Sequence, residues 1–132
     1  MTTDPQITSL SAPREFSVFS AQCPSRSILD RITSRWGVLV LAALRGRVLR
    51  FSELRRTVEG VSEKMLAQTL QTLEREGFVR RTAYPVVPPR VEYALTPLGE
   101  EAAGLVVGFV QWAEQKAPEV LRARADYDAR HR

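Results

Sequence analysis

Two glutamines and a lysine on one predicted helix have the chemistry needed to read DNA bases. Gln68 and Gln71 lie three residues apart in the segment 62–76, on the face opposite its leucines. A glutamine amide can pair with two edge atoms of adenine, and Lys64 can reach guanine or phosphate. The pattern also fits an ordinary amphipathic surface helix, so the helix alone leaves both interpretations open. The candidate DNA contacts on this helix are Ser62, Lys64, Gln68, Gln71 and Arg75.

A second group of cations lies on a hairpin predicted to follow this helix. Segments 78–84 and 91–95 alternate like strands, and the prolines of PVVPP between them predict a turn or wing tip. Arg81 and Arg90 are candidate DNA contacts, with Arg90, beside the tip, best placed for phosphate or minor groove. Adjacent side chains of a strand point to opposite faces, so Arg80 and Arg81 cannot share a groove. One of these two can instead pair with a glutamate of the helix behind.

A shorter predicted helix, which precedes the glutamine-bearing one, adds a third group. Ser52 is the expected N-cap of this helix, and helix N-termini bind phosphates. Arg55 and Arg56 follow one turn later and are candidate phosphate contacts. Either arginine can instead form a weak surface pair with Glu53 or Glu59.

Cys23 is the only cysteine of the chain, which excludes an intrachain disulfide. It precedes a helix predicted to begin between residues 24 and 26, and Arg26 lies three residues further on. A helix N-terminus and a nearby cation both favour the thiolate. A reactive Cys23 would form a disulfide between subunits or accept a small thiol. A lone cysteine is also commonly a small core residue, so both interpretations remain open.

Charge and composition narrow the function classes. The segment 45–90 holds ten basic and five acidic residues, whereas the net charge of the whole chain is +4. A clustered basic surface suits a polyanion, although a solvated arginine-rich surface has the same composition. One cysteine and one terminal histidine, His131, cannot build a zinc site. The chain shows no glycine-rich phosphate loop and no nucleophile–base pair, so we expect no metal, no cofactor and no enzyme activity.

The location of the protein is predicted from its apolar segments. The longest apolar run, Trp36 to Leu44, is about half the length that spans a bilayer. The first residues do not resemble a secretory signal. We therefore expect a cytoplasmic protein without a membrane partner.

The elements that position these residues follow the plan of a winged helix-turn-helix. Two short helices and a hairpin follow one another between Phe51 and Leu95, after a very apolar helix expected to be central to the core. The expected fold class is mainly α with a small β-hairpin, flanked by dimerisation helices. The expected parts are a mobile arm over 1–15, the winged domain with its dimerisation helix over 16–116, and a short helix or tail over 117–132.

The last long helix has a second apolar pattern. Thr96 and Pro97 predict its first residues, and it is expected to end near residue 116. A short helix is expected after Pro118, followed by frayed terminal residues. Spacings of 4, 3, 4 and 3 resemble a heptad seam, which is typical of helix pairing. The seam residues are Leu98, Ala102, Leu105, Phe109 and Trp112.

Several motifs together carry a family resemblance. They are the Cys23-Pro24 pair, RFSELRR from Arg50, EREGFV from Glu74, and PPRVEY followed by LTPLG from Pro88. Over about residues 23–112, the chain resembles the HxlR-type transcriptional regulators, a branch of the MarR-like winged helix proteins. The resemblance implies a homodimer that binds a pseudo-palindromic site in double-stranded DNA, with residues 62–75 in the major groove and Arg90 in the wing.

The same resemblance implies roles for the seam and for the cysteine. Leu98, Leu105, Phe109 and Trp112 would form the dimer together with the helix near Cys23. Several members sense oxidants or electrophiles through a cysteine immediately before proline, and Cys23 matches that position. Two alternatives stay open: control by a non-covalent small-molecule effector near the dimer helices, and a winged helix used for protein–protein interaction.

Overall fold

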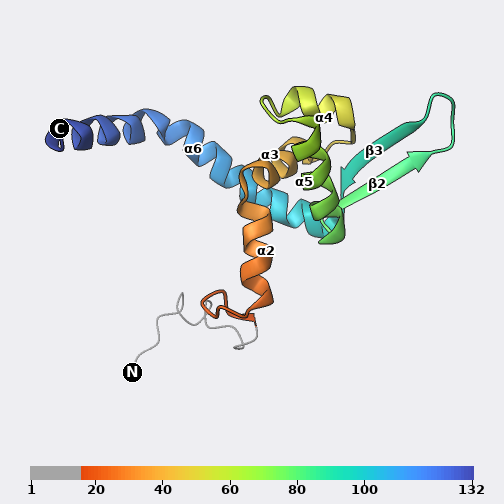
Figure 1. The fold of residues 1–132 in the computed structure, drawn as a ribbon, viewed down its shortest axis with the longest axis horizontal. Helices are drawn as coiled ribbons and strands as arrows, with labels where there is room; N and C mark the ends of the chain where they lie inside the picture. Colours follow the sequence, from red (N-terminus) through yellow and green to blue (C-terminus); the bar gives the residue numbers. More distant parts are fainter. Residues whose placement is uncertain (1–15) are drawn as a thin grey trace.

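The computed structural model describes residues 16–132, so the predicted arm over 1–15 lies outside the described residues. Figure 1 shows a helical body from which a hairpin and two helices extend. The three strands form one antiparallel sheet in the order β1-β3-β2. The predicted fold class, mainly α with a small hairpin in a winged helix-turn-helix arrangement, is confirmed. The elements are α2 (Pro24–Thr33), α3 (Arg35–Leu44), β1 (Leu49–Arg50), α4 (Phe51–Thr57), α5 (Glu63–Arg75), β2 (Val79–Tyr84), β3 (Arg90–Leu95) and α6 (Pro97–Arg130).

The hydrophobic core lies where α3, α5 and the sheet meet the first half of α6. The apolar helix α3 is central, as predicted, and α4 contributes Leu54. Each large apolar side chain buried here stabilises the body by about 1.5–3 kcal/mol relative to exposure. The largest fully buried side chains are Val40, Leu41, Leu44, Leu54, Leu66, Leu70 and Leu73.

Helix α5 begins after a serine N-cap and is followed by a glycine. The Ser62 side chain accepts a hydrogen bond from the Met65 backbone N–H at 3.1 Å. Gly77 follows the helix with φ of 87°, a conformation that favours glycine. The predicted leucine stripe is buried, but the neighbouring apolar residue Met65 is 39% exposed. One residue corresponds to about 100° of helix rotation, and this turns Met65 away from the core.

Helix α4 begins two residues earlier than expected, so the prediction that Ser52 is its N-cap is wrong. The N-cap is Arg50, and its backbone N–H donates to the Glu53 carboxylate at 2.8 Å. Phe51 is half-buried against the core and starts the helix. The hydrogen bond between the Glu53 carboxylate and the Arg50 N–H therefore defines the start of α4.

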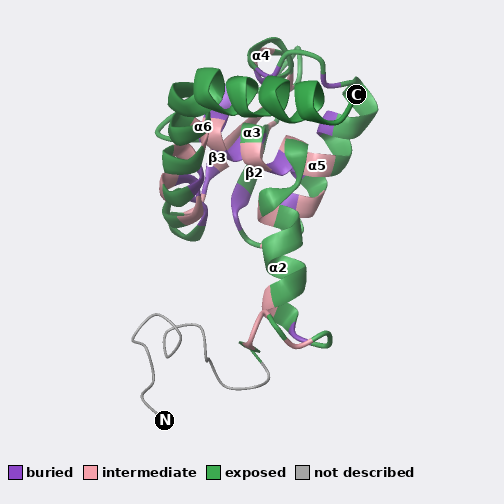
Figure 2. Ribbon diagram, turned by 90° about the vertical axis from the view of Figure 1, so that its left-hand side faces the viewer, coloured by how far each residue is buried: buried purple, intermediate pink, exposed green. Residues whose placement is uncertain are grey.

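Helix α2 projects from the body, and none of its residues is buried. Figures 1 and 2 show it extending away from the core toward the N-terminal segment. The backbone changes direction at Ser34, whose side chain accepts a hydrogen bond from the Gly37 N–H at 3.2 Å. Gly37 thus lies in the first turn of α3.

Helix α6 is anchored at its first turn. Thr96 is the N-cap as predicted: its hydroxyl accepts from the Gly99 N–H at 3.0 Å and donates to the Gly77 carbonyl at 2.6 Å. A Cβ at Gly99 would collide with the Phe78 carbonyl, so only glycine permits this approach. The anchor holds α6 against the turn that joins α5 to β2.

The predicted end of this helix near residue 116 is wrong. Helix α6 continues without interruption through Pro118 to Arg130, so there is no separate short helix after the proline, and the terminal residues expected to fray are helical up to Arg130. Proline removes one backbone hydrogen bond and commonly kinks a helix without ending it. Figure 1 shows the helix changing direction along its blue, C-terminal part.

Candidate nucleic-acid interface

The outward face of α5 presents a continuous polar stripe. Lys64, Gln68, Gln71 and Arg75 are all exposed, and their spacings of 4, 3 and 4 keep them on one side of the helix. The buried leucines occupy the opposite side. A 13-residue helix is about 20 Å long and fits a major groove about 12 Å wide. Four of the predicted contacts therefore lie together, with Ser62 at the N-terminal end of the stripe.

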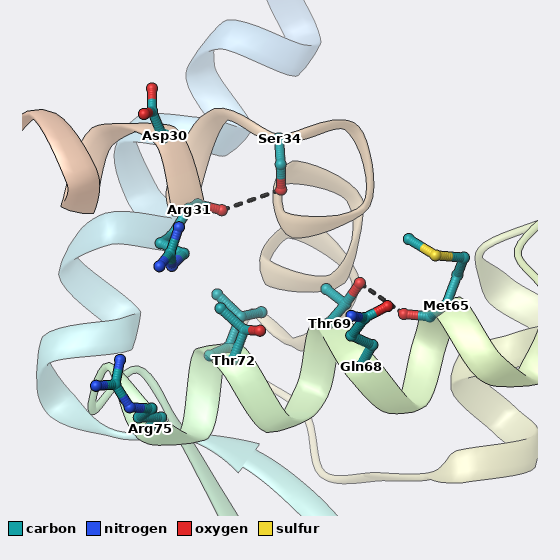
Figure 3. Close-up of a pocket in the computed structure, with 9 residues that line it drawn as sticks. Asp30, Arg31, Ser34, Met65, Gln68, Thr69, Thr72 and Arg75 are labelled. Atoms are coloured by element: carbon teal, nitrogen blue, oxygen red, sulfur yellow. Dashed lines mark hydrogen bonds between the residues drawn. The ribbon is translucent and has the colours of Figure 1, made fainter.

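A polar cleft of about 360 Å³ separates this stripe from α2. Figure 3 shows Gln68 and Thr72 on α5 and Arg31 on α2, with the Arg31 side chain directed toward α5. The Arg31 Nε lies 3.6 Å from the Glu76 carboxylate, next to the end of α5. Arg31 and Thr72 were not predicted as site residues. The cleft brings residues from two separate helices together, which helical spacing within one helix does not reveal.

The predicted phosphate contacts of α4 lie beside a hollow lined by Phe51, Ser52, Arg55, Arg56 and Glu63. The Arg55 Nη1 forms an ion pair with the Glu63 carboxylate at 3.1 Å. The partner is thus on α5 and is neither of the two acids that the sequence suggested. Arg56 is exposed and takes part in no ion pair within residues 16–132. Arg56 is therefore the less neutralised of the two cations.

The hairpin places its arginines on both of its faces. Arg81 is opposite Tyr93, whereas Arg90 is opposite Tyr84. Because side chains alternate along each strand, Arg81 lies on one face of the hairpin, and Arg90 lies on the other face with Arg80. The structure thus separates Arg81 from Arg90, although both were predicted to contact DNA.

Arg90 is held along the hairpin. Its guanidinium lies over the Tyr84 ring, 4.4 Å from the ring centroid, and its Nε is 3.7 Å from the Glu92 carboxylate. Arg80 and Arg81 are exposed, and in the described part of the chain neither pairs with an acid. The expected alternative, a pair between one of them and a glutamate of the helix behind, is therefore not seen there.

Cys23 is the N-cap of α2. Its Sγ accepts a hydrogen bond from the Ser25 N–H at 3.1 Å, and the residue is 5% exposed. Desolvation by burial raises the pKa of the thiol, but the hydrogen bonds from Ser25 and Arg26 and the charge of Arg26 outweigh it and lower the pKa. A hydrogen bond from Arg26 Nε to the Val18 carbonyl at 2.9 Å holds that cation in place. The direction of this shift is the one that a helix N-terminus and a nearby cation produce.

Four of the five seam residues of α6 are exposed, whereas Ala102 is half-buried against the core. Leu105 is 81% and Phe109 72% exposed, and the Phe109 and Trp112 rings meet edge to face with centroids 6.1 Å apart. An apolar groove of about 390 Å³ runs between α2 and α6 beside this seam. Contiguous exposed apolar surface on one chain is typical of an association site. The groove is lined by Leu29, Ile32, Thr33, Val38, Ala102, Leu105, Val106 and Phe109.

Neither a cluster of metal ligands nor a membrane-spanning helix is found in the part of the chain that the structure describes. Within 16–132, no three histidine, cysteine, aspartate or glutamate side chains come together as metal ligands. In the same range, no helix combines the length and the apolar character needed to cross a membrane.

Comparison with known proteins places this geometry among helix-turn-helix regulators. A family model described as HxlR-like helix-turn-helix matches residues 31–120. The chain is 59% identical over 111 residues to the uncharacterized HTH-type transcriptional regulator YtfH of Escherichia coli K12, covering 84% of this chain and 88% of that protein.

Two solved structures extend the comparison. The putative transcriptional regulator ytfH from Salmonella typhimurium aligns with a TM-score of 0.80 and 57% identity, covering 84% of this chain and 99% of that chain. A structure described as the redox regulator HypR in its oxidized form aligns with a TM-score of 0.65 and 34% identity, covering 70% of this chain and 96% of that chain.

Proposed function

The chain belongs to the family of HxlR-like helix-turn-helix proteins and is a transcriptional regulator of the helix-turn-helix type, and we propose that it acts as a homodimer on a pseudo-palindromic site in double-stranded DNA. The observation that carries the proposal is the exposed stripe of Lys64, Gln68, Gln71 and Arg75 on α5. Its side chains can donate to guanine and pair with adenine along one groove.

The contacts around this stripe are divided between bases and phosphates. Gln68 and Gln71 read base edges, and the cations of α4, α5 and the hairpin neutralise phosphates, which positions the protein without specifying sequence. The whole set of proposed DNA contacts is Ser52, Arg55, Arg56, Ser62, Lys64, Gln68, Gln71, Arg75, Arg81 and Arg90.

The dimer is proposed to form through the exposed seam of α6 and the adjoining face of α2. Leu98, Leu105, Phe109 and Trp112 are each more than half exposed in one chain. Pairing two copies removes this apolar area from water at about 25 cal/mol per Å². A two-fold axis then presents two equal α5 helices to two half-sites of opposite orientation.

We further propose that Cys23 makes the regulator responsive to oxidants or electrophiles. Its lowered pKa supports attack by the thiolate, and one structural neighbour is described as a redox regulator. A peroxide would convert the thiolate to a sulfenic acid, which condenses with a second thiol to a disulfide and water. Since the chain has one cysteine, that second thiol belongs to another subunit or to a small molecule.

The DNA-binding proposal is tested by fluorescence anisotropy on a duplex that the wild-type protein selects from a random pool, against a scrambled duplex at several salt concentrations. We expect tight, selective and salt-sensitive binding of the wild-type protein. Gln68→Ala should weaken the preferred site by about 1–3 kcal/mol and relax preference at particular base pairs. Gln115→Ala, at an exposed glutamine of α6, is the matched control. Equal binding to both duplexes would refute the proposal.

The apolar groove between α2 and α6 favours one alternative, a regulator controlled by a non-covalent apolar ligand. Its lining is almost entirely aliphatic and aromatic, and Trp112 lies close enough to Phe109 to report occupancy. Titration with an apolar fluorescent probe should change the tryptophan emission and the affinity for DNA together. If the probe binds without any effect on DNA affinity, the groove has no role in control by a ligand.

A further inference from the structure

Ala67 is a small apolar residue within the polar stripe of α5. It is exposed, and it follows Lys64 by three residues and precedes Gln71 by four, which places all three on the outward side of the helix. The side chains around it, Gln68 among them, are long and end in polar groups. The Ala67 methyl group therefore offers no hydrogen bond on a face whose other side chains offer several.

A second exposed apolar side chain of α5, Met65, lies on a different side of the helix. Met65 and Ala67 are two residues apart, which corresponds to about 160° of helix rotation. Met65 lines the polar cleft between α5 and α2, and Figure 3 shows it on the side of α5 that faces α2. Ala67 does not line that cleft. The apolar group that α5 presents beside its glutamines, away from α2, is thus the Ala67 methyl.

The major-groove edge of an A·T pair carries two features that match neighbouring residues of α5. Adenine presents N7 and its N6 amino group, to which a glutamine amide forms two hydrogen bonds, and thymine presents its C5 methyl group, which suits an alanine. Residues four apart on a helix have Cβ atoms about 5–6 Å apart. Ala67 and Gln71 have this spacing. An adenine contact by Gln71 therefore brings Ala67 near the methyl group of the same base pair or the next.

We propose that Ala67 reads the C5 methyl group of a pyrimidine in the major groove, an inference that rests on the DNA-binding function proposed above. Contact between the two methyl groups removes apolar surface from water, and a base without the methyl loses this gain. 5-Methylcytosine carries its methyl group at the same ring position as thymine. The ligand of Ala67 is thus a C5-methylated pyrimidine, and DNA affinity should respond to cytosine methylation at this position.

The first test removes the methyl group from the DNA. Each thymine of the selected duplex is replaced in turn by uracil, which keeps the base pairing and lacks only the C5 methyl, and binding of the full-length wild-type protein is measured by anisotropy. We expect one thymine in each half-site at which uracil weakens binding about 4-fold, the effect of burying one methyl group. A selected duplex without thymine in its half-sites, or wild-type binding that uracil leaves unchanged at every position, would overturn the proposal.

The second test assigns the methyl contact to a residue. Ala67→Ser puts a hydroxyl in place of the apolar end of the side chain and should bind the thymine and uracil duplexes equally. Ala125→Ser, at an exposed alanine of α6, is the matched control and should keep the wild-type difference. Met65→Gln should also keep it. A difference that persists in Ala67→Ser would overturn the proposal, and its loss in Met65→Gln alone would assign the contact to Met65.

The third test restores the methyl group on a different base. The sensitive T·A pair is replaced by a C·G pair, with or without a methyl group at C5 of the cytosine, so that both duplexes lack the adenine proposed for Gln71. The wild-type protein should bind the methylated duplex about 4-fold more tightly than the unmethylated one. Ala67→Ser should not distinguish the two. Equal binding of both duplexes by the wild-type protein would contradict reading of the methyl group.

The outcomes also separate the two proposals. If the wild-type protein selects no duplex from the pool, DNA binding itself fails and the proposal for Ala67 falls with it. If the wild-type protein binds selectively and uracil has no effect, only the proposal for Ala67 fails. Because Ala67 is exposed, Ala67→Ser should unfold within a few degrees of the wild-type temperature, and thermal unfolding shows that its binding behaviour does not come from loss of the fold.

Discussion

The body of the protein, residues 35–106, and the helices that extend beyond it use their apolar side chains differently. In the body, leucines from α3, α4 and α5 are almost completely buried against one another. In α2 no residue is buried, and in α6 none is buried after Val106. Figure 2 shows this contrast as purple in the body and green along α2 and the outer part of α6.

The side chains that stabilise a single chain are therefore different from those proposed to join two chains. Helices in both regions have an apolar face, but only the apolar faces of the body are buried within a single chain. The exposed apolar residues of α2 and α6, such as Leu29 and Phe109, contribute little to the fold of one chain. Substitutions in the two regions should therefore affect different measurements.

The largest effect is expected at the seam. Phe109→Glu places a charge in the proposed interface and should weaken the dimer by about 4 kcal/mol or more, roughly 1000-fold, because both copies carry the change. Sedimentation velocity over a dilution series would measure this, with Gln115→Glu, outside the seam on the same helix, as control. The monomer should keep its helical circular dichroism. Wild-type dimerisation in Phe109→Glu would remove the proposed assembly role of this region.

A smaller effect is expected in the body, where a substitution should change the stability of the chain and not its dimerisation. Gly99→Ala forces a methyl group into the Phe78 carbonyl and should lower the free energy of unfolding by about 3 kcal/mol. Urea unfolding at fixed protein concentration measures it. Gly108→Ala is the matched control, since a Cβ there meets no atom within 4 Å, and it should stabilise α6 by about 0.5–1 kcal/mol. Equal effects at the two glycines would contradict the close approach at Gly99.

The smallest effect concerns the thiol at the start of α2. Because the pKa of Cys23 is lowered, the rate of its alkylation by iodoacetamide, relative to its own maximum at high pH, should decline at a lower pH than that of a free thiol. By linkage, the thiolate stabilises the fold above the unfolded thiol's pKa, and this contribution disappears as the pH falls through the folded pKa. Arg26→Ala should shift the alkylation profile to higher pH. A profile matching free cysteine would argue against the sensor role.

Local sequence signals were sufficient for most of the body. Ser62, Gly77 and Thr96 define helix ends through hydrogen bonds or φ values that depend on near neighbours. Local sequence signals gave the wrong N-cap for α4: Ser52 was predicted, but the Glu53 carboxylate accepts from the backbone of Arg50, which is the N-cap. They also failed at Pro118, because a proline weakens a helix without deciding whether the flanking turns continue.

The residues of the candidate site that share one helix could be predicted, but the positions of residues on different elements relative to one another could not. Helical spacing was enough to find the stripe of α5, since Lys64 and Gln68 lie on the same helix. The faces of the hairpin on which Arg81 and Arg90 lie depend on the pairing register of its two strands. The ion-pair partner of Arg55 lies on another helix. Such relations arise from tertiary structure, and spacing along the chain carries no information about them.

The anchored first turn of α6 has a mechanical consequence. A 34-residue helix is about 50 Å long, so a rotation of about 5° at its base displaces its far end by about 4 Å. Thr96 and Gly99 form that base, and the turn they hold is the one in which α5 ends. The helix is therefore a lever whose fulcrum adjoins α5, the helix proposed to read DNA. A large displacement at its outer end corresponds to a small change of angle at its base.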